Sequence, residues 1–153
     1  MAGAEISLPP HAHQPGRNPR HGEEVFAAAH ASVRPGMDLA ALEASLAWRS
    51  GWLFITKGYF WEAHEVLEPV WLALPPNAPE RRFVQGLIQT ANAALKLAMV
   101  QPRAALRIVD IAEALLAECA SHPALLGLPR RPVEDYLSSI RHDSAEMARK
   151  LAL

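Results

Sequence analysis

The sequence is poor in cysteine, in net charge and in long apolar runs, and each shortage excludes a class of protein. Cys119 is the single cysteine, so an intramolecular disulfide is excluded and a reducing compartment is favoured. The formal net charge is −1 and 20% of the residues are charged, which provides no general attraction for nucleic acid. Charges interrupt the apolar runs well short of the ~18 residues that a membrane span requires. We therefore expect neither a nucleic-acid partner nor a membrane partner.

Several motifs of known chemistry are also absent. The chain has no phosphate-binding loop of the Gly-x-x-x-x-Gly-Lys type, no Gly-x-Ser-x-Gly turn and no paired-cysteine zinc pattern. No segment alternates between polar and apolar residues and no hairpin dipeptide occurs, so no strand is predicted. The N-terminal residues Met1 to Glu5 include neither the basic nor the apolar part of a secretion signal, and we expect a cytoplasmic protein.

Proline and histidine are concentrated in the first 37 residues, which we predict to form an extended N-terminal arm. This segment contains five prolines and, within eleven positions, the histidines His11, His13 and His21. Proline fixes its own φ angle and disfavours helix at the preceding residue, so only a short turn of helix around residues 23–31 is expected. A low-complexity tail is one interpretation. The other is that the arm lies across the body of the protein.

Residues 38–153 are predicted to form a single all-α domain, a compact bundle of about five helices. Half of the residues in the chain are hydrophobic, and from Asp38 onward they recur at helical spacing. Asp38 is the expected N-cap of a first helix that runs to about Lys57 and ends at Gly58. Pro69 predicts a kink or an early stop in the second helix. The expected helices cover about 38–57, 59–74, 84–98, 102–119 and 132–151.

The second helix carries the strongest candidate for chemistry. At about 100° per residue, His64 lies at the edge of the apolar face, Glu68 lies one turn later, and Glu65 lies further towards solvent. Glu62 is expected to face water. An imidazole and a carboxylate at this spacing can share a divalent metal, or the carboxylate can orient the imidazole. A structural histidine that bonds a neighbour explains the same pattern.

Known metal motifs do not match the residues around His64. A zincin requires His-Glu-x-x-His, and Glu68 stands where the second histidine would be. A bundle di-iron site requires Glu-x-x-His, whereas Glu62 precedes His64 by two positions. A metal at His64 and Glu68 would need further ligands, and the histidines that the arm could supply are His13, His21 and His30.

The third helix presents a polar stripe of residues spaced by four, three and four: Gln85, Gln89, Asn92 and Lys96. Such a row of amides ending in a cation could hold a polar or anionic ligand against the second helix. The alternative is the ordinary wet face of an amphipathic helix. Gly86 lies within this helix, where glycine costs ~1 kcal/mol relative to alanine, and it is expected to permit close approach of another helix.

Four tryptophans fall in the first two predicted helices. Three of them are expected in the core, whereas Trp61 points away from the main apolar face. Trp61 is therefore a candidate ligand platform, interface residue or contact for the arm, and we favour the interface. With Leu72 or Leu97 it would form an apolar patch suited to self-association.

Two segments resemble the uncharacterised helical family catalogued as domain of unknown function 309 (DUF309). They are Gly58-Tyr-Phe-Trp-Glu-Ala-His-Glu-Val-Leu-Glu68 followed by Trp71, and Arg82-Phe-Val-Gln-Gly-Leu-Ile-Gln89 with Ala91-Asn92. The resemblance covers about residues 46–116 closely. It implies an all-α fold found in small bacterial and archaeal proteins, and it carries no established activity. The family signature falls here on Gly58, Glu62, His64, Glu65, Glu68, Trp71, Gln85, Gly86 and Gln89, whereas Pro69 departs from it.

Three functions remain open from the sequence. The first is a non-catalytic module that binds a metal ion or a small polar ligand where His64, Glu65 and Glu68 converge with Gln85 and Gln89. The second is a metal-dependent hydrolase, which would also need an open coordination position and a base such as Glu65. The third is a structural or oligomerisation domain, in which the same polar residues only fix the packing of the helices.

Overall fold

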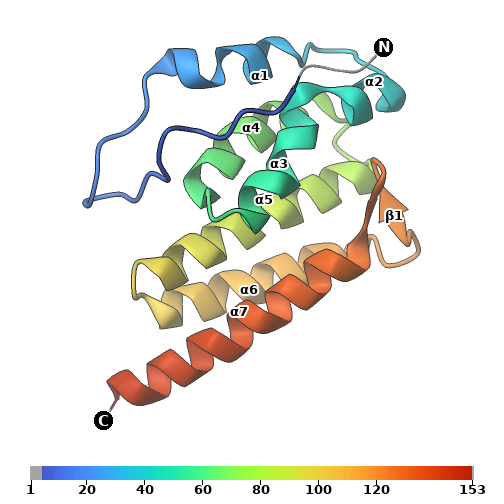
Figure 1. The fold of residues 1–153 in the computed structure, drawn as a ribbon. Coiled ribbons are helices and arrows are strands. Elements are labelled where there is room, and N and C mark those ends of the chain that lie inside the picture. The colour runs from blue at the N-terminus through green and yellow to red at the C-terminus, as the bar shows by residue number, and fades with distance from the viewer. Residues whose placement is uncertain (1–4, 153) are drawn as a thin grey trace.

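Helices make up most of residues 5–152, the part of the chain that this computed structural model describes, and the predicted all-α class is confirmed (Figure 1). The order of elements is η1 (Glu23–Phe26), α1 (Ala27–Ala31), α2 (Leu39–Ala44), α3 (Leu46–Thr56), α4 (Phe60–Ala73), α5 (Pro79–Ala98), α6 (Pro102–Glu118), β1 (Ala124–Leu125), β2 (Leu128–Pro129) and α7 (Arg130–Leu151). None of these helices combines the length and the apolar character needed to cross a bilayer.

The first predicted helix is two helices, which corrects the expected continuous run from Asp38 to Lys57. Asp38 caps α2 as predicted, because its Oδ1 accepts from the backbone N–H of Ala41 at 2.8 Å. Ser45 then adopts an extended conformation, and its Oγ accepts from the N–H of Trp48 at 3.2 Å. Ser45 thus begins a new helix, a role that its sequence position within an apolar pattern concealed.

Helix α3 ends in a glycine C-cap and crosses α4 closely. Gly58 has a φ of +88°, and the N–H groups of Gly58 and Tyr59 bond back to the carbonyls of Ile55 and Phe54 at 3.1 and 2.8 Å. This pair of bonds is the Schellman arrangement that ends many helices. A methyl group on Gly51 would lie 2.2 Å from Cδ2 of Leu67, so the glycine sets the separation of α3 and α4.

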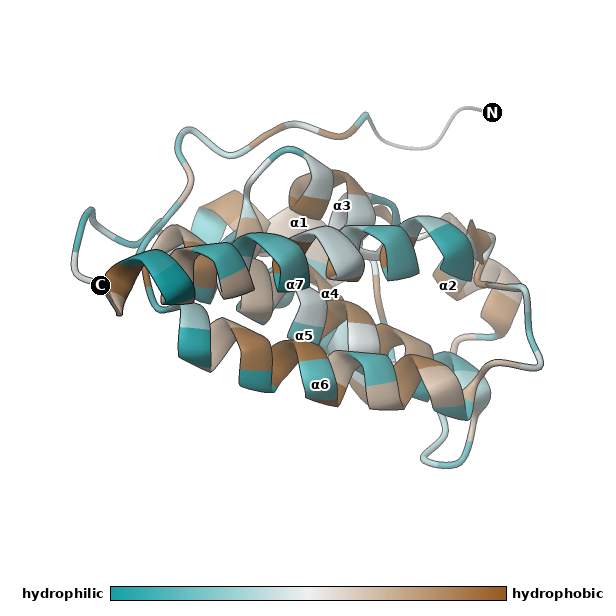
Figure 2. Cartoon of the chain, turned by 90° about the horizontal axis from the view of Figure 1, so that it is seen from below, coloured by the Kyte–Doolittle hydropathy of each residue, from teal (hydrophilic) through white to brown (hydrophobic). Residues whose placement is uncertain are grey.

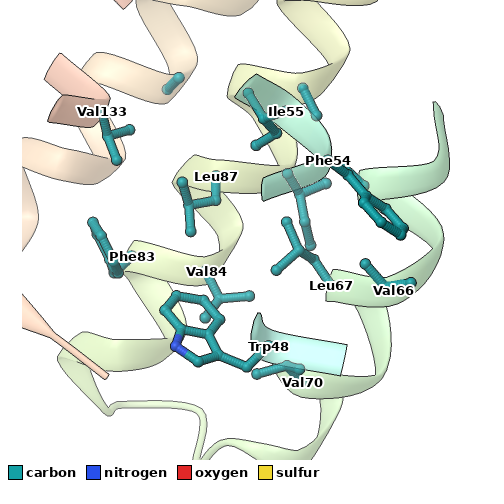
Figure 3. Packing of buried hydrophobic residues seen from close by; sticks show 14 of the residues in the cluster. Trp48, Phe54, Ile55, Val66, Leu67, Val70, Phe83, Val84, Leu87 and Val133 are labelled. Atoms are coloured by element: carbon teal, nitrogen blue, oxygen red, sulfur yellow. The ribbon is translucent and has the colours of Figure 1, made fainter. Parts of the chain in front are cut away.

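Helix α5 lies at the centre of the bundle, packed against α4 on one side and against α6 and α7 on the other (Figure 1). Its fully buried residues include Phe83, Val84 and Leu87, which meet side chains from α3 and α4 in the core (Figure 3). Gly86 faces α6, where an added Cβ would lie 3.3 Å from Leu116, so the expected close approach is present.

Between α6 and α7 the chain forms an antiparallel hairpin whose two strands have two residues each, which corrects the prediction of no strand. Ala124 pairs with Pro129 and Leu125 with Leu128. The turn residues Leu126 and Gly127 both have positive φ angles, 49° and 77°, as a type I′ turn requires. Leucine is an unusual residue for this position. The carbonyl of Leu126 accepts from the indole N–H of Trp48 at 2.7 Å, and this buried hydrogen bond connects the hairpin to α3.

Helices α6 and α7 complete the far side of the bundle. Arg141 of α7 bonds to both Asp110 and Glu113 of α6, and the outer face of α7 is largely hydrophilic (Figure 2). Cys119 is fully buried and its Sγ donates to the carbonyl of Leu116 at 3.3 Å. Burial raises the pKa of the Cys119 thiol, which favours the unreactive protonated form. The cysteine thus occupies the core position expected from the sequence.

Candidate functional site

The N-terminal arm lies across α4 and is anchored on Glu62, the reverse of the expectation that Glu62 faces water (Figure 1). The Glu62 side chain is 0% exposed. Its Oε2 accepts from the backbone N–H of His13 and from Nε2–H of His21, each at 2.6 Å. The angular count failed because it treated α4 as covered on one side, whereas the arm covers a second side. Two of the three arm histidines considered as ligands thus meet the signature carboxylate Glu62 instead of His64.

The second oxygen of Glu62 is buried without a partner. Oε1 makes no hydrogen bond within the described residues, and it has almost no solvent contact. A buried carboxylate is costly unless it is bonded and paired, so Glu62 relies strongly on the contacts of Oε2. Deep burial of this acid is therefore tied directly to the position of the arm.

His21 is held in one orientation by Glu62 and by three aromatic neighbours. Its ring centroid lies 4.3 Å from that of His11, 5.7 Å from that of Phe26 and 6.2 Å from that of Trp61. Because a carboxylate only accepts, the bond to Glu62 places a hydrogen on Nε2 and leaves Nδ1 as the acceptor of a neutral ring. A carboxylate-oriented imidazole of this kind is a recurrent element of binding and catalytic sites.

Trp61 is half-buried beneath the arm, so the alternative of a contact for the arm is present, and the favoured interface role stays a prediction. The ring of His13 meets it edge-on at 4.8 Å between centroids, and Phe26 lies at 5.9 Å. The guanidinium of Arg20 lies 5.6 Å from the indole centroid, within reach of a cation–π interaction. The arm thus covers part of Trp61, whereas Leu72 of the same helix is 61% exposed.

A pocket of about 510 Å³ opens where the arm, η1 and α1 meet α4. Arg20, His21, Glu23, Phe26 and His30 line it from the arm side, and Trp61 and Glu65 line it from α4. Trp61 and Glu65 are thus the predicted site residues that reach this pocket. Arg20, Glu23 and Phe26 also line this pocket and were not predicted as site residues, although histidine and proline are unusually dense in this segment.

Pro69 lies inside α4 without ending the helix, which continues to Ala73 and corrects the alternative of an early stop. Proline lacks the N–H that would bond the carbonyl of Glu65 four residues earlier. Nε2–H of His30 donates to that carbonyl at 3.0 Å instead. The arm therefore supplies from α1 the donor that Pro69 removes from the helix.

His64 and Glu68 form a pair on the solvent side of α4. Their Nε2 and Oε2 atoms are 3.3 Å apart, and the side chains are 37% and 50% exposed. Within residues 5–152, no group of three or more His, Cys, Asp and Glu side chains is placed to hold a metal ion. The predicted proximity of His64 and Glu68 is present, and the arm histidines lie against Glu62 and Glu65 instead.

The polar stripe of α5 is half-buried and partly bonded to itself. The side-chain amide of Asn92 donates to Oε1 of Gln89 at 3.4 Å. In the described part of the chain, no hydrogen bond joins Gln85 or Gln89 to His64 or Glu68. Lys96 lies near the end of α5, where its charge suits the negative end of the helix. The structure thus leaves the α4 pair and the α5 stripe as separate features.

A family model described as Domain of unknown function (DUF309) matches residues 48–108. No significant match to a curated protein or to a solved structure was found. The matched stretch runs from α3 into α6 and contains Glu62, Trp61 and Glu65, whereas the arm residues that meet them lie outside it. The match to this family of unknown function confirms, over residues 48–108, the resemblance to DUF309 that the sequence indicates.

Proposed function

We propose that this protein binds a small polar ligand in the pocket between the N-terminal arm and α4. The observation that carries the proposal is the buried Glu62–His21 pair, which orients an imidazole in the wall of a pocket rather than on an open surface. A pocket with a few convergent polar groups is the usual form of a small-molecule site. Its volume of about 510 Å³ lies within the range typical of such sites.

The lining combines features that serve recognition more than packing. Arg20, Glu23 and Glu65 bring charges of both signs, and Trp61 and Phe26 contribute aromatic rings. Ordering the arm over α4 costs conformational entropy, and its bonds to Glu62 offset part of that cost. A bound ligand would contact both the arm and α4, so it should stabilise the docked arm by mass action.

The proposal is tested by screening small metabolites for thermal stabilisation of the full chain. The library should contain nucleosides, sugars, carboxylic acids, amines and amino acids. We expect at least one compound to raise the Tm of the wild type, and Glu65→Gln to reduce that rise because Glu65 lines the pocket. His64→Ala is the matched control, since His64 lies on the same helix outside this pocket lining.

Two results would contradict the proposal. One is a library in which no compound stabilises the wild type. The other is a stabilising compound whose effect survives Glu65→Gln and Arg20→Ala but disappears in His64→Ala, which would move the site to the solvent side of α4. Both variants replace partly exposed side chains, so their folding can be verified from their own Tm values.

A further inference from the structure

In the described part of the chain, the arginine and glutamate side chains of the arm pocket have no ion-pair partners. Within residues 5–152, Arg20 contacts the ring of Trp61 and pairs with no carboxylate. Glu23 and Glu65 likewise make no ion pair in this part of the chain, although each lines the same pocket as Arg20. Elsewhere on the molecule, charged side chains such as Arg130 and Glu134 do pair. The pocket therefore holds one positive and two negative groups that a ligand can contact.

In its neutral form, each of the two histidines of the pocket has one further hydrogen-bond acceptor. Nε2–H of His21 is bonded to Glu62, and Nε2–H of His30 is bonded to the carbonyl of Glu65. In a neutral ring the remaining atom, Nδ1, accepts a hydrogen bond. Together with the carboxylates of Glu23 and Glu65, these atoms form a set suited to a ligand that donates several hydrogen bonds, as an ammonium group does.

The rings of Trp61 and Phe26 define the apolar part of the pocket. Both residues line it, and their centroids lie 5.9 Å apart. Aromatic faces attract cations and also pack against apolar groups. A ligand that matches the whole lining thus has an ammonium group, an anionic group for Arg20 and a small apolar part.

We propose that the ligand is a zwitterion of the α-amino-acid class, an inference that rests on the proposed binding function of this pocket. Glu23 and Glu65 receive the ammonium group, Arg20 binds the carboxylate, and the ligand side chain lies against Phe26 and Trp61. These charged groups come from both walls of the pocket, since Arg20 and Glu23 belong to the arm side and Glu65 to α4. Binding of the zwitterion therefore joins the arm to the helix.

The test is isothermal titration of the full chain with three matched probes. They are L-phenylalanine, 2-phenylethylamine, which lacks the carboxylate, and 3-phenylpropanoate, which lacks the amine. The remaining common amino acids are titrated in parallel, with the corresponding amine and acid for the one that binds most tightly. We expect the zwitterion to bind at least about tenfold more tightly than either singly charged analogue, because each charge-assisted hydrogen bond is lost with its group.

Variants assign the two charge contacts separately. Arg20→Ala should weaken the amino acid about tenfold and leave the amine unchanged, whereas Glu23→Gln with Glu65→Gln should weaken the amine and leave the acid unchanged. Arg20→Lys keeps the charge and should restore part of the affinity. His64→Ala is the control and should bind as the wild type does.

The outcomes separate this inference from the proposed function. If the amine or the acid binds as tightly as the amino acid, the ligand class is wrong while the pocket still binds. A second outcome is that no amino acid binds but another compound of the thermal screen does, and its binding depends on Glu65. The ligand class is then wrong while the proposed binding function holds. If no compound in either experiment binds, both the ligand class and the proposed function fail.

Discussion

The two sides of α4 each carry an acid and an imidazole, and the two pairs differ in almost every physical respect. Glu62 and His21 are 41 positions apart in the sequence, their Oε2 and Nε2 atoms are 2.6 Å apart, and both side chains are almost completely buried. His64 and Glu68 are one helical turn apart, lie 3.3 Å from each other and are substantially exposed. Burial makes the first pair sensitive to the loss of either partner, whereas water can replace each partner of the second. The pair that helical spacing reveals in the sequence, His64 and Glu68, is thus the pair that contributes less to stability.

The largest effect is expected from Glu62→Ala. This change removes the acceptor of two buried donors, the N–H of His13 and Nε2–H of His21, and should lower the free energy of unfolding by about 3 kcal/mol. Urea denaturation followed by circular dichroism measures the change. Glu62→Gln keeps the size of the side chain and one acceptor oxygen, so it should lower the free energy of unfolding by less than Glu62→Ala does. A loss below about 1 kcal/mol for Glu62→Ala would show that the arm does not depend on this carboxylate.

An intermediate effect is expected from His30→Ala. The carbonyl of Glu65 would lose the donor that replaces the missing N–H of Pro69, at a cost of about 1 kcal/mol in the free energy of unfolding. In a Pro69→Ala background, the alanine N–H can bond that carbonyl, so His30→Ala should then cost about 0.5 kcal/mol or less. A double-mutant cycle measured by urea denaturation gives the coupling. Equal costs in both backgrounds would contradict the compensation.

The smallest effect is expected on the solvent side of α4. His64→Ala and Glu68→Ala should each change the free energy of unfolding by no more than about 0.5 kcal/mol, since exposed pairs one turn apart contribute little. Added salt should reduce the effect further. A loss comparable with that of Glu62→Ala would remove the contrast between the two sides.

Local chemistry was enough to predict most of the helical architecture. Asp38, Gly58 and Pro102 were read correctly as helix boundaries, because a cap, a left-handed glycine and a first-turn proline act within a few residues. Ser45 was missed because its neighbours Leu42 and Leu46 continue an apolar pattern across the break. The hairpin was missed because Leu126 occupies a left-handed position that usually takes glycine or asparagine.

The candidate site was predictable only in part, because it depends on a contact between distant segments. Helical periodicity placed His64 and Glu68 together correctly, since both lie on one helix. The same periodicity wrongly predicted that Glu62 faces water, because no spacing along α4 reveals that the N-terminal arm covers this residue. The family signature includes Glu62, which is a signal for this residue that does not depend on its angle on the helix.

The attachment of both His13 and His21 to one oxygen of Glu62 has a consequence for how the molecule opens. Two points eight residues apart along the arm share a single acceptor, so loss of that carboxylate removes both bonds in one step. The arm is thus held at α4 by Glu62 and, next to His13, at the end of α5 by the bond from Nε2–H of Gln14 to the carbonyl of Ala98 at 3.1 Å. We expect local opening of the arm to expose Trp61 and Glu65 while the rest of the bundle stays folded.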